Sequence, residues 1–518
     1  MAETKREIER KYEATGETPV PDLTKVPEVS QAVDRGVMEL DAVYYDTPDL
    51  RLAADSVTLR RRTGGSDAGW HVKFPVAAGI RDEIRAPLSD TLPDELAGLL
   101  RSRVRTGAVV PVVRLRSSRD VRHLLAADGT LLAELSVDTV HATRLPEGPE
   151  ATWTEIEVEL ADGPDGPDHH EGPGGPDPAL LDAIGKRLGK AGIHPSASAS
   201  KLARALAETG GGGRPRPPAA PAEPGTAAAA VLAYAREQIH AIVALDPAVR
   251  RDLPDAVHQL RVACRRLRSA LKTYRRVLDR NVTDPVGDEL KWLAGELGVA
   301  RDHEVLDARL RAHVAELPPT LVLGPVRARL RRRDAARARS ARHQALAALD
   351  SARHLALLDT LDALLAAPPL RKAARRDARK VLARAVRADH ARLGGRIEHA
   401  LSLDPGHERD LALHDARKAA KRARYAADAA RPTLGKPAKR LAKRVKAVQS
   451  LLGEHHDSVV ARTALRELGI QAHGVGESAF TWGLLHGHEE AAAAAVEREL
   501  PAAWDRASAP GIRSALTR

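Results

Sequence analysis

The sequence predicts a multidomain protein with an α+β N-terminal domain, built on an antiparallel sheet, and an all-α C-terminal domain. Three observations support this. A Gly- and Pro-rich linker at 208–225, which can neither hold a helix nor pack a core, divides the 518 residues. Short segments rich in Val, Leu, Thr and Trp alternate with turn residues before it. Long Ala-, Arg- and Leu-rich segments follow it and contain an internal repeat, which is typical of helical bundles.

The N-terminal domain, residues 1–207, contains nine segments with strand character and two short helical segments. Sequential strands joined by short turns favour an antiparallel meander that can close into a barrel. The strands are expected at Glu7–Ala14, Leu40–Asp46, Val57–Thr63, Gly69–Phe74, Asp82–Pro87, Val110–Arg116, Arg119–Ala126, Thr130–Val137 and Ala151–Leu160, and the helices at Asp94–Leu100 and Leu180–Leu188. The Gly-, Pro-, His- and Asp-rich residues 162–178 are expected to form a loop.

Charged residues at a spacing of two recur on these strands. Because successive side chains of a strand point to opposite faces, Glu7, Glu9 and Lys11 share one face. The same spacing recurs in Arg60 and Arg62, in Arg81, Glu83 and Arg85, in Arg114 and Arg116, and in Glu155, Glu157 and Glu159. Any one pair suits a solvated face, but the whole set would be very costly in a dry core. We therefore interpret the barrel interior as a site where carboxylates bind Mg²⁺ or Mn²⁺ and cations bind phosphate oxygens.

Composition indicates an acidic partner without bases. The formal net charge is +11, from 81 Lys and Arg against 70 Asp and Glu. Only 2 Phe, 5 Trp and 6 Tyr are available to stack bases, which disfavours nucleic acid and favours a polyphosphate. The single cysteine, Cys264, suits a reducing compartment. With no apolar run of membrane-spanning length, these features predict a cytoplasmic protein that does not associate with membranes.

The C-terminal domain, residues 226–510, contains a duplicated helical unit. The segment that begins at His258 resembles the segment that begins at His414, 156 residues later. Leu297-Gly298, followed by Asp302, resembles Leu452-Gly453, followed by Asp457, at an offset of 155 residues. Two matched motifs at nearly one offset indicate two related halves, at about 226–370 and 371–510.

Each repeat carries cations along one helix face, because a helical residue advances by about 100°. The first face carries His258, Arg261, Arg265, Arg268 and Lys272, and the second carries His414, Arg417, Lys421 and Arg424. Stacked like charges repel, and a bound polyanion would relieve that repulsion. A further basic helix carries Lys439, Arg440, Lys443, Arg444 and Lys446. Arginines around His258 and His414 disfavour a metal there, and His455, His456, His486 and His488 are interpreted as local surface features.

The N-terminal domain resembles the CYTH domains, or triphosphate tunnel metalloenzymes. Glu7-Ile-Glu9-Arg-Lys11 is similar to their ExExK signature. The rest of the ordered match comprises Tyr44-Tyr45-Asp46-Thr47, Leu59-Arg60-Arg61-Arg62, Lys73, Arg114-Leu115-Arg116, Asp138 and Glu155-Ile156-Glu157. The resemblance, over Thr4–Leu206, implies an eight-stranded antiparallel tunnel that acts on triphosphates with Mg²⁺ or Mn²⁺.

The same resemblance implies roles for individual residues. The implied metal-binding residues are Glu7, Glu9, Glu155, Glu157 and Asp138, with Glu159 included because the strand register is ambiguous by two residues. The implied triphosphate-binding residues are Lys11, Arg60, Arg62, Lys73, Arg114, Arg116 and Lys201. Glu83 and Arg85 are further candidate site residues, and here the chain departs from the family pattern, since several relatives carry an acid where Arg85 stands.

The C-terminal domain resembles the CHAD domains, all-helical modules that contain histidines. The match runs over Thr226–Leu500 and depends on the two histidine-led cationic helices and the two Leu-Gly-x-x-x-Asp segments. It implies two pseudo-symmetric four-helix bundles around a basic groove that binds inorganic polyphosphate. The nine cationic and histidine residues of the two repeat faces are the implied polyphosphate ligands.

The leading hypothesis is a metal-dependent hydrolase of inorganic triphosphate, or of a related triphosphate, fused to a polyphosphate-binding module. Such a module could place the protein at polyphosphate granules in the cytoplasm. One alternative is a non-catalytic polyphosphate-binding or targeting protein. Another is a hydrolase or cyclase of an organic triphosphate, such as thiamine triphosphate or ATP.

Overall fold

A computed structural model describes residues 3–15, 18–65, 67–161, 178–210 and 222–516. The chain divides into two compact units, Met1–Pro218 and Ala219–Arg518. Most of the Gly- and Pro-rich linker (211–221) and nearly all of the predicted loop (162–177) lie outside the described residues, as do the side chains of 299–302, 334–336, 338 and 513.

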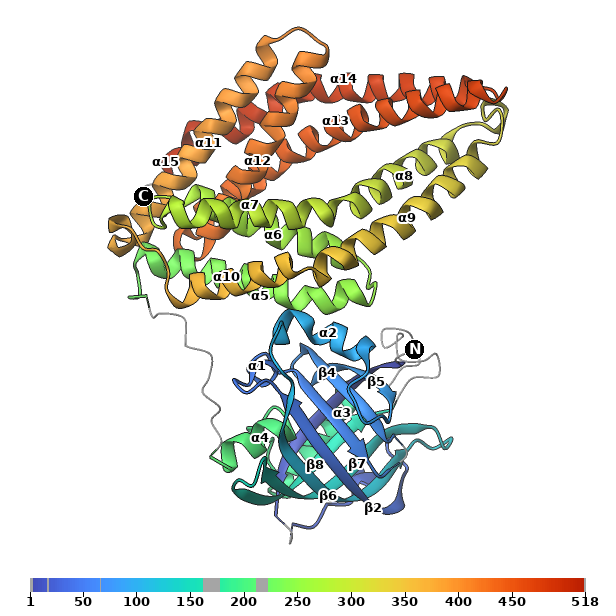
Figure 1. The fold of residues 1–518 in the computed structure, drawn as a ribbon, viewed down its shortest axis with the longest axis vertical. Helices are drawn as coiled ribbons and strands as arrows, with labels where there is room; N and C mark the ends of the chain where they lie inside the picture. The colour runs from blue at the N-terminus through green and yellow to red at the C-terminus, as the bar shows by residue number, and fades with distance from the viewer. Residues whose placement is uncertain (1–2, 16–17, 66, 162–177, 211–221, 517–518) are drawn as a thin grey trace. The chain divides into compact units, whose positions relative to one another are not determined.

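The first unit is a closed antiparallel barrel of eight strands in the order β1-β5-β4-β3-β2-β6-β7-β8 (Figure 1). The strands are β1 (Glu3–Ala14), β2 (Gln31–Asp46), β3 (Thr58–Thr63), β4 (Gly69–Ala77), β5 (Ile80–Pro87), β6 (Val110–Leu125), β7 (Leu131–Arg144) and β8 (Glu150–Leu160). The helices are α1 (Arg51–Ala54), α2 (Asp94–Val104), α3 (Pro178–Lys190) and α4 (Lys201–Glu208), with a short 3₁₀ helix at Leu23–Lys25. The eight-stranded antiparallel tunnel is confirmed.

Two of the predicted strands are one continuous strand. Val110–Arg116 and Arg119–Ala126 were expected to be separated at Ser117 and Ser118, but β6 runs through both serines. Ser117 lies opposite Leu40 of β2 and Val140 of β7, so the serine pair is held by a neighbour on each side. Pairing on both edges outweighs the low strand propensity of serine.

Apolar layers outside the barrel determine which side chains point inward. Ile8 and Tyr12 of β1 belong to a buried cluster with Ile156 and Val158 of β8 and with Leu181 of α3. Because side chains alternate along a strand, the intervening Glu7, Glu9 and Lys11 face the barrel interior, as predicted. A second outer layer packs Leu59, Trp70, Val72 and Ile84 against α2.

Helix α4 closes one end of the barrel. Leu202 and Ala205 of α4 pack with Ala42 and Leu115, which lie opposite each other on β2 and β6. Leu40, two residues from Ala42 and therefore on the same face, lines the interior cavity. This packing places Lys201, the first residue of α4, inside the barrel, where it lines the same cavity.

The second unit is helical and consists of two related sets of four long rods. The helices are α5 (Ala227–Arg250), α6 (Ala256–Thr273), α7 (Arg280–Glu296), α8 (Gly298–Glu316), α9 (Val326–Asp350), α10 (Ala352–Ala366), α11 (Ala378–Ser402), α12 (His407–Leu434), α13 (Lys436–Gly474), α14 (Phe480–Ser508) and α15 (Pro510–Ser514), with 3₁₀ turns at Pro319–Leu321 and Lys372–Arg375. Helices α7 and α8 together correspond to α13, and α9 and α10 together correspond to α14 (Figure 1). The predicted pair of four-helix bundles is confirmed.

The two halves of the helical unit share one hydrophobic core. Helix α6 packs against α12, and α5 packs against α11. Buried residues from both halves, such as Leu260 and Leu267 of α6 and Leu413 of α12, belong to one cluster. Helix α5 is long and apolar enough to span a membrane by length and composition, but Val231, Ile239 and other residues along it belong to this core.

Candidate functional site

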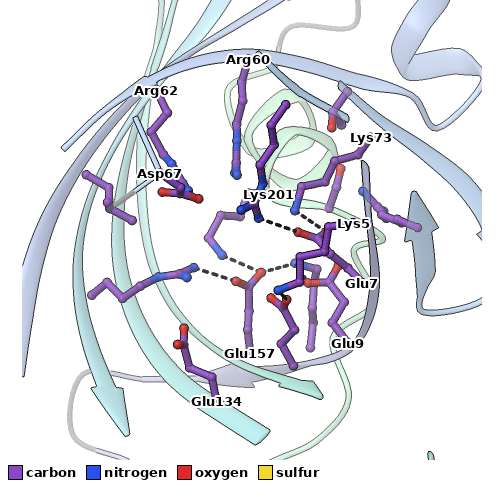
Figure 2. A pocket seen from close by; sticks show the side chains of 18 of the residues that line it. Lys5, Glu7, Glu9, Arg60, Arg62, Asp67, Lys73, Glu134, Glu157 and Lys201 are labelled. Carbon is purple, nitrogen blue, oxygen red and sulfur yellow. Dashed lines mark hydrogen bonds and ion pairs between the residues drawn. The ribbon is translucent and has the colours of Figure 1, made fainter. Parts of the chain in front are cut away.

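A polar cavity of about 300 Å³ occupies the barrel interior (Figure 2). Its charged lining comes from seven of the eight strands, from α4 and, with Asp67, from the turn between β3 and β4. The lining includes Lys5, Glu7, Glu9, Lys11, Arg60, Arg62, Asp67, Lys73, Arg81, Arg85, Arg119, Glu134, Glu157, Glu159 and Lys201. Most of the residues predicted for the tunnel therefore face one cavity.

The two glutamates of the opening motif are buried and paired with lysines. Glu7 is 3% exposed and lies 2.6 Å from Nζ of Lys73, while Glu9 is 7% exposed and lies 3.3 Å from Nζ of Lys11. Burial raises the pKa of Glu7 to about 7 despite the nearby Lys73. Burial also raises the pKa of Glu9, but Lys11, Lys73 and Arg81 together outweigh it, so the net pKa of Glu9 is lowered.

Three other carboxylates form a compact acid triad, Asp138, Glu155 and Glu157. Asp138 of β7 lies opposite Glu155 of β8, and one ligand oxygen from each member lies within 4.8 Å of the others. The ammonium of Lys201 contacts all three carboxylates, at 2.9 Å from Asp138, 2.8 Å from Glu155 and 2.6 Å from Glu157. Burial alone would lower the pKa of Lys201, but the negative charges of the three acids have a larger effect, so the pKa of Lys201 is raised.

The acid triad fits a hard divalent cation. Mg²⁺ and Mn²⁺ prefer carboxylate oxygens, and all three members of the triad supply them from rigid strands. The acids already gather around a positive charge, the ammonium of Lys201. A metal ion that binds here would therefore compete with Lys201 for the same oxygens.

Glu83 organises cations instead of offering a free metal ligand. Its carboxylate is fully buried and contacts Nδ1 of His71 at 2.9 Å, Arg60 at 3.3 Å and Lys73 at 3.5 Å. Arg85 completes the set at 2.5 Å. Burial raises the pKa of Glu83, but Lys73, His71 and Arg60 reverse the shift and lower it. The carboxylate thus holds three lining cations, Arg60, Lys73 and Arg85, in place.

Arg114 and Arg116 do not line the tunnel, which corrects the prediction. Both are exposed on the outer face of β6, where Arg114 forms an ion pair with Asp41 of β2. Because β6 is continuous, the residue that shares the inward face with Leu115 is Arg119. Arg119 lines the cavity and bonds Asp138 at 2.7 Å and Glu157 at 2.8 Å. Spacing along one unbroken strand was the signal that would have found it.

The described tunnel wall is close to neutral. Nine cationic side chains line the cavity against six carboxylates, and three further buried acids, Glu83, Asp138 and Glu155, contact those cations. Burial and the neighbouring cations Arg60 and Arg119 lower the pKa of Arg62, so positive charges also crowd one another locally. A polyanion that entered alone would bring uncompensated charge, so its complex with a divalent cation suits the cavity better.

A second polar cavity, of about 630 Å³, lies in the helical unit. It unites the two sequence repeats, because α6 and α12 pack against each other. Its lining contains His258, Arg261 and Arg265 from α6, His414, Arg417, Lys421 and Arg424 from α12, Arg309 from α8, and Gln449, His456 and Asp457 from α13. The buried Nε of Arg265 has no hydrogen-bond acceptor among the described residues.

Arg268 and Lys272 lie outside this cavity, which shortens the predicted first cationic face. They do not appear among its described lining residues. The side chain of Arg268 approaches Gly287 of α7, and the charges of Asp284 and Asp288 on α7 act on Lys272. These two cations therefore belong to the contact between α6 and α7.

Two titratable groups of the second cavity, His414 and Lys421, have lowered pKa values. Nδ1 of His414 lies 3.1 Å from Nδ1 of His456, so one ring donates and the other accepts. Burial and nearby cations such as Lys418 and Arg417 lower the pKa of His414. Burial, followed by Arg417 and Arg265, lowers the pKa of Lys421 to about 7.

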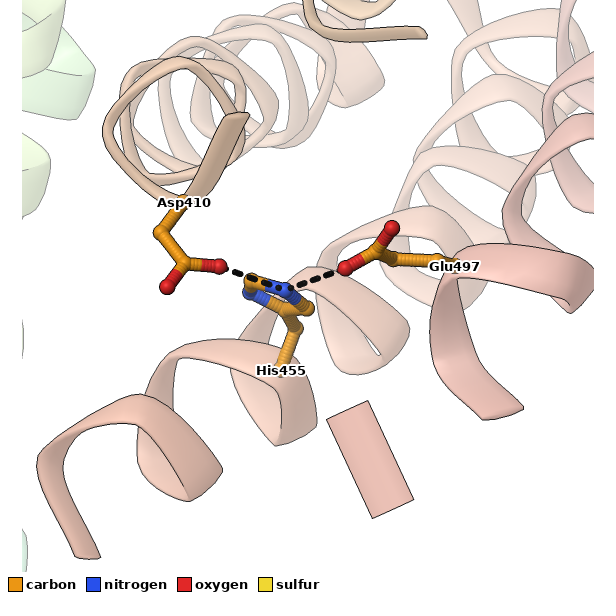
Figure 3. Close-up of side chains that lie close together, drawn as sticks. All are labelled: Asp410, His455 and Glu497. Carbon is orange, nitrogen blue, oxygen red and sulfur yellow. Dashed lines mark hydrogen bonds and ion pairs between the residues drawn. The ribbon is translucent and has the colours of Figure 1, made fainter. Parts of the chain in front are cut away.

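His455 and His456 are not surface features, which corrects a further expectation. His456 lines the cavity, and His455 is 2% exposed, with Nε2 at 3.3 Å from Asp410 and 3.2 Å from Glu497 (Figure 3). Arg462 pairs with Asp410 at 2.9 Å, and Arg409 pairs with Glu497 at 2.7 Å. Because these arginines balance both carboxylates, the cluster joins α12, α13 and α14 without needing a metal.

Comparison with known proteins matches both units. The CYTH domain model matches residues 5–167, and the CHAD domain model matches residues 233–466. Two uncharacterised proteins from two strains of Mycobacterium tuberculosis are 38% identical over 521 residues, covering 96% of this chain and 95% of theirs.

Two solved structures resemble parts of the chain. PptA from Streptomyces chartreusis covers 54% of this chain and 99% of its own, at 24% identity and a TM-score of 0.46. The CHAD domain from the plant Ricinus communis covers 58% of this chain and 96% of its own, at 27% identity and a TM-score of 0.40. The full-length relatives and the two domain matches place the chain in the family of proteins that carry a CYTH domain followed by a CHAD domain.

Proposed function

We propose that the barrel hydrolyses inorganic triphosphate, or a related triphosphate, with Mg²⁺ or Mn²⁺, and that the helical unit binds inorganic polyphosphate. CYTH domains generally act on triphosphates, and their tunnels use divalent metals. The observation that carries the proposal is the closed barrel whose interior cavity interleaves lysines and arginines with buried carboxylates. A metal–triphosphate complex suits this lining, because the carboxylates can bind the metal ion while the lysines and arginines bind the phosphate oxygens.

The lining residues have distinct roles in this proposal. Lys11, Arg60, Arg62, Lys73 and Arg119 would bind phosphate oxygens and stabilise the charge that develops on them during phosphoryl transfer. Glu7, Glu9 and the acid triad would hold the metal, with Glu159 beside them. When bound, the metal would neutralise phosphate charge and lower the pKa of an attacking water.

Phosphate release by the purified full-length protein tests the catalytic part. With Mg²⁺, we expect faster release from inorganic triphosphate than from ATP or thiamine triphosphate. Faster release from an organic substrate, or formation of cyclic AMP from ATP, would favour the alternative organic-triphosphate enzyme. If no substrate releases phosphate while polyphosphate still binds, the protein is a binding or targeting protein and the hydrolase proposal is wrong.

Polyphosphate suits the helical cavity better than nucleic acid does. Tyr425 is the only Phe, Trp or Tyr among the described lining residues, so the cavity has little capacity to stack bases. Cations from both repeats line the cavity, and the buried Nε of Arg265 has no hydrogen-bond acceptor among the described residues. Binding of this kind would hold the protein at polyphosphate granules in the cytoplasm. Equal affinity for duplex DNA and polyphosphate at matched salt would contradict this assignment.

Arg119→Gln is expected to weaken triphosphate binding by about tenfold to a hundredfold, because it removes a half-buried cation that lines the tunnel. Arg116→Gln is the matched control, since it removes the same charge from the exposed face of the same strand. KM for triphosphate and direct binding measure the difference. Equal losses in both variants would show that Arg119 has no special role.

Polyphosphate affinity is expected to fall as the pH rises above about 7. Lys421, whose pKa is lowered to about 7, is charged below that pH and largely neutral above it in the free protein. A bound polyanion raises that pKa, so binding above pH 7 requires proton uptake, and affinity falls by up to about tenfold per pH unit.

The Lys421→Arg variant isolates this effect, because arginine stays charged throughout the range. The polyphosphate affinity of this variant should be nearly constant between about pH 7 and 9. The charged groups around position 421, which are Arg261, Arg265, Arg417 and Asp457, are the same in both proteins. Isothermal titration at several pH values measures both proteins. If the affinity of the wild-type protein stays constant over this range, deprotonation of Lys421 does not control polyphosphate binding and the prediction is wrong.

A further inference from the structure

The first three turns of α13 present a row of exposed lysines, Lys436, Lys439, Lys443 and Lys446, here called the lysine track. No acidic residue occurs between Gly435 and Gly453. Among the described residues, no ion pair or hydrogen bond involves these four side chains. Unpaired like charges repel along a helix face, so the track is destabilising by itself and would gain from a polyanion.

The lysine track continues directly from the helical cavity. Lys439 precedes the cavity-lining Asp457 by 18 residues, which is five turns, so the two lie on one line of α13. At about 100° per residue, the other three lysines lie within about 60° of that line. The small uncharged residues Ser450, which is exposed, and Gly453, which is half-buried, lie between the cavity and the track.

The other half of the helical unit reverses the charge at two of the four track positions, whereas Lys446 corresponds to Lys291 and Lys436 to Asn281. At the offset of 155 residues, the positions of Lys439 and Lys443 correspond to Asp284 and Asp288 of α7. Glu289 of α7 corresponds in the same way to Arg444. The duplicated fold is therefore electrostatically one-sided, with cations on α13 where α7 carries acids.

We propose that the lysine track binds the part of a long polyphosphate chain that emerges from the helical cavity, so that the chain leaves along α13 and not along α7. This inference rests on the proposed polyphosphate binding and adds its direction and length dependence. From Gln449 at the cavity to Lys436, the track extends about 20 Å. A short chain would fill the cavity alone, whereas a long chain would gain the lysine contacts as well.

The experiment compares two double variants of the full-length protein. Lys439→Glu with Lys443→Glu places on α13 the type of charge that α7 carries at those positions. Arg440→Glu with Arg444→Glu is the matched control, because it reverses two charges at the same spacing on exposed positions about 100–140° from the line of Asp457. Affinities are measured by titration with a short and a long polyphosphate at one salt concentration.

We expect the track variant to lose about tenfold in affinity for the long chain and little for the short chain, with a smaller loss in the control. Equal losses in both variants would show that only the overall charge of the helix matters, and the proposal that the lysine track binds the chain would be wrong. If wild-type protein binds neither chain, the proposed polyphosphate function itself fails. If RNA competes with the long chain at equal affinity, the track is a general polyanion surface and not a polyphosphate site.

Discussion

Glu9→Gln is expected to reduce metal-dependent phosphate release from triphosphate by at least about a hundredfold while polyphosphate binding persists. Glu9 is 7% exposed, lines the tunnel and faces Lys11 at 3.3 Å. Glutamine keeps the size of the side chain but removes the charge that a divalent cation requires. Glu7→Gln should behave in the same way, because Glu7 lines the same cavity from the same strand.

The control for these variants is Glu3→Gln, which removes an exposed carboxylate from the same strand. Its phosphate release should match that of the wild type. The helical unit has its own core and its own cavity, so its polyphosphate affinity should not change in any of the three variants. If a folded Glu9→Gln protein lost both turnover and polyphosphate binding, the assignment of the two functions to separate units would be wrong.

Strand alternation predicted the tunnel face well wherever the strand was correctly identified. Glu7, Glu9 and Lys11 alternate with Ile8 and Tyr12, and the structure places the first set inside and the second against an outer core. Arg114 and Arg116 do share one face, but that face points outward, because Leu115 between them packs against α4 on the inner side. Alternation gives the relative orientation of residues, but only the neighbouring strands decide which face points inward.

Contacts between distant segments were beyond the reach of local patterns. Lys201 follows Asp138 by 63 residues, and only the closure of the barrel by α4 brings the two together. His455 appeared to be a surface residue because it stands in a polar stretch, yet α12 and α14 bury it between two carboxylates. Arg268 fits the helical spacing of its cationic face but lies beside α7, whose packing the spacing alone cannot show.

Lys201→Met is expected to raise the affinity of the substrate-free protein for Mn²⁺ by at least about tenfold. The ammonium of Lys201 contacts all three members of the acid triad and is 10% exposed, so it occupies the position that favours a metal. Methionine retains much of the length and apolar packing of lysine without its charge. The freed carboxylates gain a strong electrostatic preference for a divalent cation.

Thermal unfolding with and without Mn²⁺ separates this exchange from a general loss of packing. Removing one partner from a buried ion-pair cluster typically costs about 3–5 kcal/mol, so Lys201→Met should unfold at a lower temperature without metal. Mn²⁺ should then restore stability more in the variant than in the wild type, because it binds the folded acid triad. Lys5→Met is the matched control, since Lys5 pairs at 2.8 Å with Glu159, which is not a member of the acid triad. An unchanged Mn²⁺ affinity in Lys201→Met would mean that lysine and metal use different oxygens in the tunnel.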